Sequence, residues 1–343
     1  MEGFGTEPDG DYFEGEVRFD TQARAMYATD ASNFRQPPIG VVIPRTIDDI
    51  VAAHVACHEH GAPIVNRGAG TSLSGETVNF AVVIDHSKYL NHVLEIDTES
   101  RWAHCETGVI NEQLNLAVAD YGLVFPPDPS THEYCTIGGN LGNNSCGVHS
   151  VQAQLYGPGP RTSDNTHSLE IVTYDGIRMW VGETSDEEYD AVIEEGGRRA
   201  EIYAGLRDLR DRYGEAIRAR FPSVEKLPRR VSGYNLDELL PENGFNLARA
   251  LVGTESTCAT VLTAKMHLTE QTKARSLLVV GFDDICVAAE HIPEIMEARP
   301  IALEGIDHLL FENEQHMNIE PQALSQLPDG NAILVLDPVI AAG

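Results

Sequence analysis

The most constraining feature of this sequence is a glycine-rich segment, residues 66–76 (NRGAGTSLSGE), that follows the second strand of a βαβ pattern. The pattern consists of an apolar strand at 41–43, a helix that Thr46 caps and Gly61 ends, and a strand at 63–66. Glycines let successive backbone N–H groups converge on an anion, and the hydroxyls and the arginine of this segment add further donors. The candidate contacts of a pyrophosphate are Arg67, Gly68, Ala69, Gly70, Thr71, Ser72, Leu73 and Ser74.

Two familiar phosphate-binding loops do not fit this segment. A Rossmann fingerprint requires glycine where Leu73 stands and a helix directly after the loop, and we find neither. A Walker loop requires Gly-Lys-Ser or Gly-Lys-Thr, which is also missing. The segment therefore predicts a phosphate cradle of another type, with a flexible turn as the alternative interpretation.

A second candidate region is the Pro-, Gly-, Asn- and Ser-rich stretch 125–165, which we expect to be a long functional loop. Within it, residues 136–140 (TIGGN) and 142–147 (GNNSCG) alternate glycines with short polar side chains, which suit hydrogen bonds along a cofactor. Asp128-Pro129-Ser130 fixes the entry to this stretch, and residues 253–257 (GTEST) offer another hydroxyl-rich turn before a strand. An ordinary Asn/Gly turn is the alternative for the two glycine motifs.

The rest of the chain predicts a mixture of short strands and helices. We expect further strands at 81–85, 93–97, 102–107, 169–174, 177–181 and 261–268, and helices at 108–121 and 203–220. Asp175-Gly176 predicts a hairpin, and the acidic residues 183–197 predict a solvated surface. A strand-helix-strand unit is expected at 277–282, 285–296 and 301–303.

Taken in order, several motifs resemble the FAD-binding domain of the vanillyl-alcohol oxidase and p-cresol methylhydroxylase (PCMH) superfamily. They are VVIP, PIVNRGAGTSLSG, VVID, CETGVINEQLN, FPPDPST, TIGGNLGNNSCG and VGTEST. Within the superfamily, the sequence is most similar to D-lactate, glycolate and D-2-hydroxyglutarate dehydrogenases, including long forms fused to an iron-sulfur domain. The resemblance implies an α+β fold with an acidic leader (1–26), two FAD-binding subdomains (27–107 and 108–270) and an incomplete α/β substrate cap (271–343).

The resemblance also implies which residues hold FAD. Residues 67–74 would bind the pyrophosphate, and Glu255 would lie near the adenosine or ribityl part. The other implied contacts are Pro129, Ser130, Ile137, Gly138 and Gly139 at the isoalloxazine, and Asn144, Ser145 and Gly147 along the cofactor. Some members bond a loop histidine covalently to the flavin, but Asn66-Arg67 occupies that stretch here, so we expect non-covalent FAD. A thioether to Cys146 is the alternative, and Ser256 stands where relatives commonly carry glycine.

The reaction that the resemblance implies is oxidation of a 2-hydroxy acid by hydride transfer to flavin N5. The family's metal ligands lie further downstream and have no counterpart here, so we expect no metal site, and we assign no catalytic residue. His308 and His316 are expected to be surface or core residues, whereas Arg229 and Arg230 are candidates for meeting an anionic substrate or partner, with solvated surface as the equal alternative. Other interpretations are a non-catalytic or partner-dependent FAD-binding fragment, served by an electron acceptor or iron-sulfur partner, and a flavin-dependent reductase of the cell-wall precursor type.

Charge narrows the possible partners. The 343 residues include 53 acidic and 24 basic ones, and the net charge of −29 argues against nucleic acid or anionic lipid as a partner. Self-repulsion of this size favours a salt-rich cytosol, with an acidic surface that merely keeps the protein soluble as the alternative. No apolar run long enough to span a membrane occurs, so we expect a cytoplasmic protein that at most docks on a membrane surface. The six cysteines contain no CxxC pair, so neither a zinc site nor an iron-sulfur cluster is expected.

Overall fold

The first sheet is built around the βαβ unit that the sequence predicts. The computed structural model describes residues 13–151, 157–223, 226–227, 229–272, 276–319 and 321–337. Strands β1 (Glu16–Arg18), β2 (Gly40–Ile43), β3 (Ile64–Arg67) and β4 (Val82–Asp85) form the order β1-β2-β4-β3, and only β1 is antiparallel to its neighbour. Because β3 and β4 are parallel, the chain leaves both strands at the same edge of the sheet.

The sequence predicts a loosely ordered leader before residue 27, but the structure has a strand and a helix in this segment. β1 pairs with β2 in the register Glu16↔Ile43, and α1 (Thr21–Met26) begins at Asp20, whose carboxylate accepts from the Ala23 N–H. The prediction is wrong for the described residues before Tyr27, because β1 hydrogen bonds to the otherwise open edge of the first sheet. Residues 1–12 of the leader lie outside the described part of the chain.

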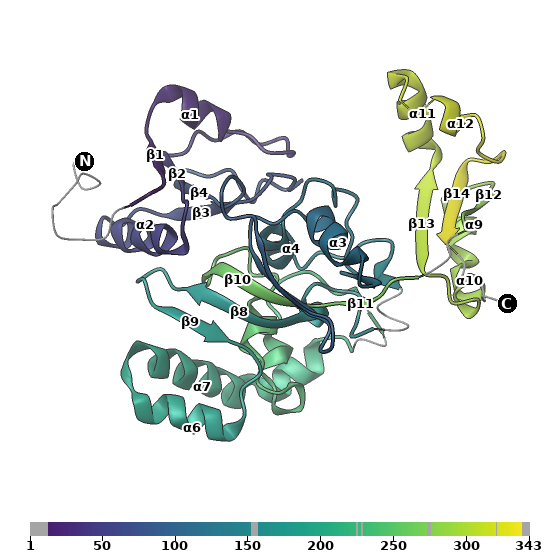
Figure 1. Ribbon diagram of the computed structural model, residues 1–343. Helices are drawn as coiled ribbons and strands as arrows, with labels where there is room; N and C mark the ends of the chain where they lie inside the picture. Colours follow the sequence, from purple (N-terminus) through teal and green to yellow (C-terminus); the bar gives the residue numbers. More distant parts are fainter. Residues whose placement is uncertain are drawn as a thin grey trace.

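Helix α2 (Ile47–Glu59) connects β2 to β3 and packs between the two sheets. It begins at a capping box in which Thr46 and Asp49 each accept the other's backbone N–H. Cys57 belongs to the apolar cluster of the first sheet, whereas Ile50 lies in a cluster with residues of the second sheet. The helix therefore contacts both subdomains, and Figure 1 shows it between the first sheet and strands β8 and β9 of the second.

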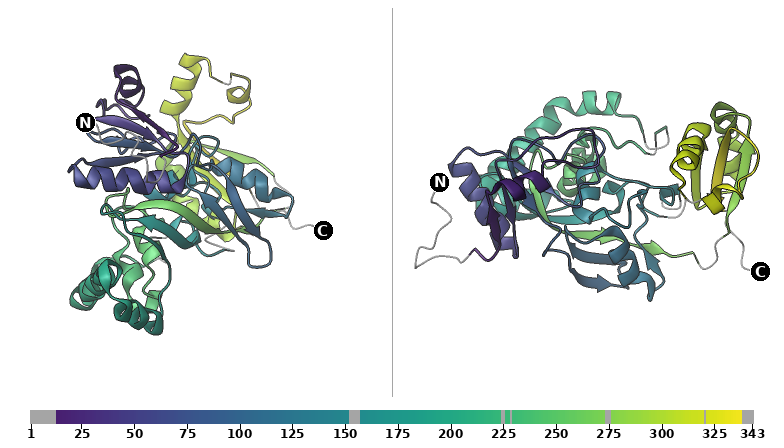
Figure 2. Two further views of the ribbon diagram at one scale, coloured as in Figure 1. Left: turned by 60° about the vertical axis from the view of Figure 1, so that its left-hand side comes forward. Right: turned by 90° about the horizontal axis from the view of Figure 1, so that it is seen from above.

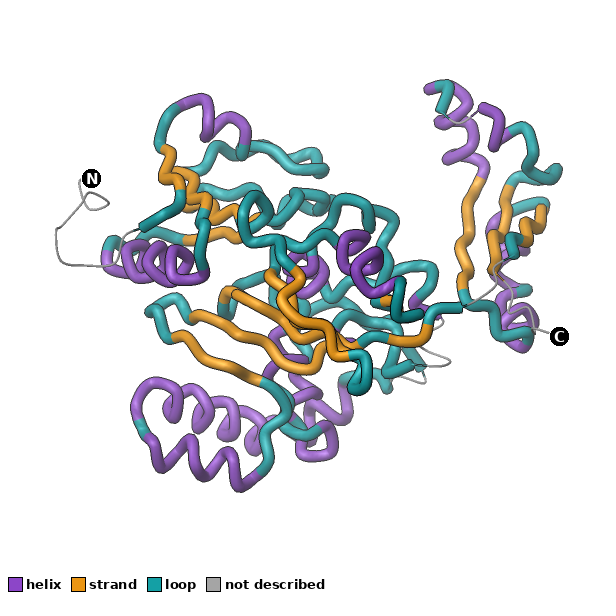
Figure 3. The backbone as a smooth tube through the Cα atoms, viewed as in Figure 1, coloured by secondary structure: helices purple, strands orange, loops and turns teal. Residues whose placement is uncertain are grey.

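The second sheet is antiparallel throughout, in the order β5-β6-β10-β8-β9. Its strands are β5 (Val93–Asp97), β6 (Trp102–Glu106), β8 (Thr166–Val172), β9 (Arg178–Val181) and β10 (Thr260–His267). The helices of this part are α3 (Asn111–Ala119), α4 (Ile137–Asn143), α6 (Asp186–Glu195), α7 (Gly197–Arg220) and α8 (Leu247–Leu251). A small pair, β7 (Leu123–Val124) with β11 (Thr269–Glu270), and three short 3-10 turns at 163–165, 236–239 and 241–243 complete it. The main apolar core lies between this sheet and its helices, which Figure 3 distinguishes by colour.

The two sheets divide the chain elsewhere than the sequence predicts. β5 and β6 belong to the second sheet, so the division falls between Asp85 and Val93 rather than at residue 107. The reason is the pairing of β6 with β10, which places Cys105 opposite Ala264. Such a distant partner has no signal in the local pattern of either strand.

Three local predictions also need correction or refinement. The stretch 125–165 is not a continuous loop, because Thr136 caps helix α4 by accepting the Gly139 N–H. The acidic residues 183–197 include helix α6, and the following helix begins at Gly197 rather than at residue 203. The predicted hairpin is confirmed, with β8 and β9 paired and Gly176 at φ +86° in the turn.

The C-terminal unit is a separate antiparallel sheet with four helices. Strands β12 (Leu278–Phe282), β13 (Ala302–Asp307) and β14 (Ala332–Asp337) form the order β12-β14-β13. The helices are α9 (Ile285–Glu290), α10 (Ile292–Glu297), α11 (His308–Met317) and α12 (Pro321–Leu324). The single helix expected at 285–296 is two helices. The unit lies to one side of the two subdomains, as the right-hand view of Figure 2 shows. The expected overall α+β fold is confirmed. No helix in the described ranges has the length and apolarity needed to cross a membrane.

Candidate functional site

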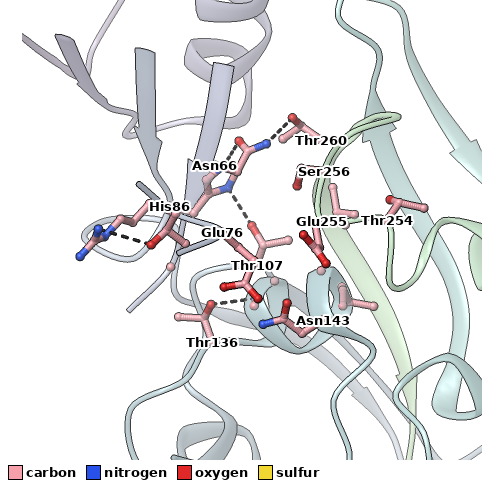
Figure 4. A pocket seen from close by; sticks show the side chains of 18 of the residues that line it. Asn66, Glu76, His86, Thr107, Thr136, Asn143, Thr254, Glu255, Ser256 and Thr260 are labelled. Carbon is pink, nitrogen blue, oxygen red and sulfur yellow. Dashed lines mark hydrogen bonds between the residues drawn. The ribbon is translucent and has the colours of Figure 1, made fainter. Parts of the chain in front are cut away.

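A cleft between the two sheets brings together the motifs that the sequence analysis singled out. One wall carries the glycine loop after β3 and the end of β4, and the other carries the turn before β10 (Figure 4). The start of α4 forms the floor between them. The polar residues that line it include Asn66, Arg67, Ser72, Glu76, His86, Thr107, Thr136, Asn143, Thr254, Glu255 and Thr260.

The glycine loop presents free backbone donors. No hydrogen bond to another part of the described chain is formed by the backbone N–H groups from Gly68 to Thr77. Gly70 and Gly75 adopt φ values of +69° and +85°, which only glycine reaches without strain. Gly68 packs so closely on Thr136 that a Cβ at this position would clash with the Thr136 hydroxyl. The loop therefore offers unpaired backbone N–H donors of the kind that bind a pyrophosphate.

Arg67 holds the loop in place and adds a positive charge to it. Its guanidinium donates to the Thr29 carbonyl over 2.9 Å and lies 5.5 Å from the centre of the Tyr27 ring. A Cβ on Gly70 would clash with this guanidinium, so the loop folds back over the arginine. None of the described carboxylates forms an ion pair with Arg67, and its charge therefore remains available to an anion.

Close packing fixes the start of α4 at the floor of the cleft. The Gly138 N–H donates to the Thr107 carbonyl over 2.8 Å, and a Cβ on Gly138 would lie 2.9 Å from that carbonyl oxygen. Glycine is therefore required here by close approach rather than by an unusual φ. The N-terminal amides of α4 are used within the protein, so the free donors of the cleft come from the loop after β3.

The turn before β10 forms the opposite wall and is strained. Its Gly253 and Glu255 N–H groups donate to the carbonyls of Leu141 and Gly142 at the end of α4, over 2.8 and 3.1 Å. Glu255 and the following Ser256 both have positive φ, +53° and +61°. The left-handed conformation explains why glycine suits the position of Ser256.

The polar groups of the cleft fit a dinucleotide cofactor. The Glu76 carboxylate lines the cleft, and its Oε2 is buried without a hydrogen-bond partner. Carboxylates accept hydrogen bonds from ribose hydroxyls, and the loop amides match the pyrophosphate between the two halves of such a cofactor. Glu76 and Glu255 thus supply acceptors on the two walls, and the loop supplies donors between them.

The structure gathers six of the predicted FAD contacts around this cleft and leaves the others outside its lining. The six are Arg67, Gly68, Ser72, Gly138, Gly139 and Glu255. Within the same loop, Leu73 is 78% exposed, and Ala69, Gly70, Thr71 and Ser74 do not line the cleft. Ile137 is fully buried in the main core. The remaining predicted contacts are also absent from the lining, and they are Pro129, Ser130, Asn144, Ser145 and Gly147.

The loop after α4 is held by its own contacts. Asn144 accepts the Ser163 N–H on Oδ1 over 2.9 Å, and the Ser145 carbonyl accepts the Thr162 N–H over 2.9 Å. Gly147 packs against the Asp128 carbonyl with no room for a Cβ. These contacts explain the small residues of the motif by backbone packing.

The two arginines that the sequence analysis named have different environments. Arg230 donates to both carboxylate oxygens of Asp237 over 2.7 Å, so its charge is already paired and the hypothesis of a free anion-binding group is wrong for it. Arg229 is exposed, and its Nε donates to Cys146 Sγ over 3.1 Å. Of these two, only Arg229 remains a candidate for an anionic substrate.

The described residues contain no group of three or more His, Cys, Asp or Glu side chains arranged to hold a metal ion. His308 and His316 lie at opposite ends of α11, and both are exposed.

Sequence analysis missed two buried histidines beside the cleft. His86 directly follows β4, is 4% exposed, and burial lowers its pKa to about 4. His54 lies on α2, and burial lowers its pKa as well. A signal for His86 exists in the sequence, because it follows a strand parallel to the one that precedes the glycine loop. His54 has no such signal, since it occupies an ordinary position on an amphipathic helix.

The chain matches one protein family and several curated proteins. Residues 38–182 match the family described as FAD binding domain. The chain is 30% identical over 299 residues to the D-2-hydroxyglutarate dehydrogenase of Pseudomonas putida. This match covers 86% of the chain and 29% of the dehydrogenase. It is also 30% identical over 288 residues to the glycolate oxidase subunit GlcD of Bacillus subtilis, covering 83% of this chain and 49% of that one. The chain thus spans less than half of the length of either relative.

Among solved structures, the fold is similar to that of an alkyldihydroxyacetonephosphate synthase. The TM-score is 0.60 at 16% sequence identity, and the match covers 94% of this chain and 52% of the synthase. At this identity the likeness shows the fold alone. Together the matches confirm the resemblance drawn from the sequence.

Proposed function

We propose that the FAD-binding domain of this chain, residues 38–182, serves the oxidation of a small 2-hydroxy acid of the D-2-hydroxyglutarate or glycolate class. The observation that carries the proposal is the cleft itself, whose lining contains both Glu255 and two residues of the glycine loop with unpaired amides, Gly68 and Ser72. The substrate class is supported by the names of two groups of curated proteins that the chain matches, the D-2-hydroxyglutarate dehydrogenases and the glycolate oxidase subunits.

Each wall of the cleft has a role in this proposal. The amides after Gly68, together with Arg67, hold the pyrophosphate, and Glu255 accepts hydrogen bonds from the ribityl or adenosine hydroxyls. Gly138 and Gly139 allow close approach to the isoalloxazine, which, when bound, supplies the acceptor for the hydride of the substrate. The further contacts that the resemblance implies, at Pro129, Ser130, Ile137 and along the motif 144–147, belong to this same proposal.

Arg229, which contacts the loop after α4 through Cys146, is the cation that we propose for the substrate carboxylate. Arg229 has a thiol rather than a carboxylate as its partner, so its charge is free to pair with an anion. We assign no general base, because no described side chain in the cleft has a position relative to a substrate that would single it out.

The experiment is to purify the chain, reconstitute it with FAD and add D-2-hydroxyglutarate, glycolate or D-lactate without oxygen. The expected result is a yellow protein whose flavin absorbance bleaches with one of the three acids. Acid precipitation should release the flavin into the supernatant, because we propose non-covalent binding. A flavin that stays with the precipitate overturns non-covalent binding, and bleaching by NADPH alone overturns the substrate class.

A second candidate function is favoured by the length of the match. The chain spans 29% and 49% of these relatives. In this candidate function it supplies the FAD-binding part of a larger assembly, and another part completes the substrate site. An electron acceptor or an iron-sulfur protein would then be the partner. A reconstituted yellow protein that none of the three acids bleaches would favour this candidate over a self-sufficient dehydrogenase.

A further inference from the structure

Five hydrogen bonds form a continuous side-chain path along the wall of the cleft. The path runs from the Ile50 carbonyl to His54 Nδ1 (2.9 Å), and from His54 Nε2 to Thr260 Oγ1 (2.8 Å). It continues from Thr260 Oγ1 to Asn66 Nδ2 (2.7 Å), and from Asn66 Oδ1 to His86 Nε2 (3.0 Å). The last bond joins His86 Nδ1 to Thr107 Oγ1 (2.9 Å).

The Ile50 carbonyl at the start of the path fixes the donor and the acceptor of every bond that follows. A carbonyl can only accept, so His54 carries its proton on Nδ1, and its Nε2 accepts from the Thr260 hydroxyl. Thr260 in turn accepts from the Asn66 amide, whose oxygen accepts from His86 Nε2–H. The Thr107 hydroxyl then donates to His86 Nδ1. All five bonds thus point the same way, and both imidazoles are neutral, as their lowered pKa values require.

The path crosses between the two subdomains three times. Asn66 lies on β3, His86 directly follows β4, and His54 lies on α2. On the side of the second sheet, Thr260 begins β10 and Thr107 directly follows β6. Thr260 is 3% exposed and receives contacts from both Asn66 and His54. Loss of one partner would leave a buried polar group unsatisfied on the other side of the interface.

The path touches both elements that we assign to the cofactor. Asn66, within the path, lies on β3, which leads into the glycine loop. The backbone carbonyl of Thr107, the last residue of the path, accepts from Gly138 at the start of α4. We propose that this hydrogen-bonded path is a clasp in which Asn66, His54 and Thr260 act as positioning residues that set the width of the cleft and so retain FAD. The inference rests on FAD occupying this cleft.

The test compares the rate of FAD release among variants, followed by the rise in flavin fluorescence after the holoprotein is diluted. Thr260→Val keeps the shape of the side chain and removes the hydroxyl, whereas Thr260→Ser keeps the hydroxyl. We expect release from Thr260→Val to be about tenfold faster, the change that loss of one buried hydrogen bond predicts. Thr260→Ser should stay within about twofold of the natural chain.

Thr263→Val is the matched control. Thr263 lies three residues further along β10 and is 1% exposed. It hydrogen bonds to His104 Nε2 over 2.9 Å, entirely within the second sheet. This variant should lose a similar free energy of unfolding in urea without releasing FAD faster. If Thr260 only stabilised the fold, both variants would change the rate of FAD release equally. Equal release rates from Thr260→Val and Thr263→Val would therefore overturn the clasp.

His54→Leu tests the clasp without altering the lining of the cleft, because His54 is not among the residues that line it. It removes the acceptor of the Thr260 proton, so release should again be faster than from the natural chain. An unchanged rate in His54→Leu would overturn the inference even if Thr260→Val failed to fold. A natural chain that binds no FAD at all would overturn the assignment of the cleft, which is a separate result.

Discussion

The side-chain amide of Asn66 donates a 2.7 Å hydrogen bond to Thr260 Oγ1, although 194 residues separate the two in sequence. Asn66 lies on a strand of the first sheet, and Thr260 begins β10 of the second. This bond places the glycine loop opposite the turn at Glu255 and so forms the cleft. Its consequences for stability and for FAD binding can be measured.

Gly68→Ala should lower the affinity for FAD by at least about tenfold. A Cβ at this position clashes with the Thr136 hydroxyl, which caps α4 by accepting from the Gly139 N–H over 3.1 Å. Either the loop or the cap must therefore move, and loss of the cap alone costs about 1 kcal/mol. Titration of the apoprotein with FAD, followed by fluorescence, measures the change. Gly205→Ala is the control, since open space surrounds Gly205, and equal affinities of the two variants would contradict the prediction.

Ser256→Gly should stabilise the protein by about 0.5 to 1 kcal/mol. Ser256 has a φ of +61°, a left-handed conformation that costs a residue with a Cβ about 1–2 kcal/mol. Glycine avoids this cost, but its greater freedom in the unfolded chain cancels part of the gain in stability. Unfolding in urea measures the difference. Ser256→Ala keeps the Cβ and should show no gain, so a gain of equal size in that variant would rule out backbone strain as the cause.

Stability should fall as the pH drops from neutral toward 4. His86 has its pKa lowered from the usual 6.5 to about 4, chiefly by burial, with Asp85 opposing the shift and His54 adding to it. Between pH 6.5 and about 4, this histidine is therefore protonated in the unfolded chain and neutral in the folded chain. Its contribution to the free energy of unfolding is fully present above pH 6.5 and is lost as the pH falls below that value. Each such histidine contributes a slope of about 1.4 kcal/mol per pH unit in this window.

The measurement is the free energy of unfolding in urea at several pH values between about 7.5 and 4.5. Carboxylates add their own slope, so the comparison with His86→Gln is what isolates the histidine. That variant should be less stable at neutral pH and should show a shallower slope. The exposed His60 provides the control, and a His60→Gln slope as shallow as that of His86→Gln would contradict the assignment.

The thiols should divide into two classes toward a charged disulfide reagent. Cys258 and Cys286 are exposed and should react in the folded protein. Cys57, Cys105 and Cys135 are buried, and burial raises the pKa of Cys57 to about 11 and that of Cys105 to about 12, so little thiolate is available to react. Peptide mapping after timed labelling identifies the sites. Rapid labelling of Cys105 in the folded state would show that the second sheet opens readily.

Salt should raise the melting temperature of the chain. The net charge of −29 produces self-repulsion that counterions screen, because the Debye length shrinks to about 3 Å at molar salt. Melts recorded from about 0.1 M to 2 M KCl measure the effect. Trehalose serves as an uncharged control, and an equal rise with trehalose would point to exclusion of solute rather than to screening.

Several elements follow from the sequence because their causes are local. The capping box of α2 joins Thr46 to a residue three positions away, and the hairpin between β8 and β9 depends on the turn at Gly176. The glycine loop was predicted for the same reason, since its free amides and positive φ values are properties of consecutive residues.

Other elements could not be predicted, because their partners lie far along the chain. The sequence IGGNLGN of α4 has poor helix propensity, and the helix forms where Ile137 and Gly138 donate to the carbonyls of Val109 and Thr107. The partner of Arg230 is nearer, because Asp237 lies seven residues away, but the irregular segment between them has no periodic pattern that would predict the contact.

The sequence by itself thus determined the βαβ unit, the glycine-rich conformation of its loop and the cofactor class, since these depend on residue types within a few positions of one another. The tertiary structure alone decided where the two sheets divide, which predicted contacts share one cleft, and that two neutral histidines join its walls through Asn66 and Thr260. Those features arise from contacts between residues that are 150 or more positions apart. Such contacts depend on how strands from different sheets are brought together, which no local pattern specifies.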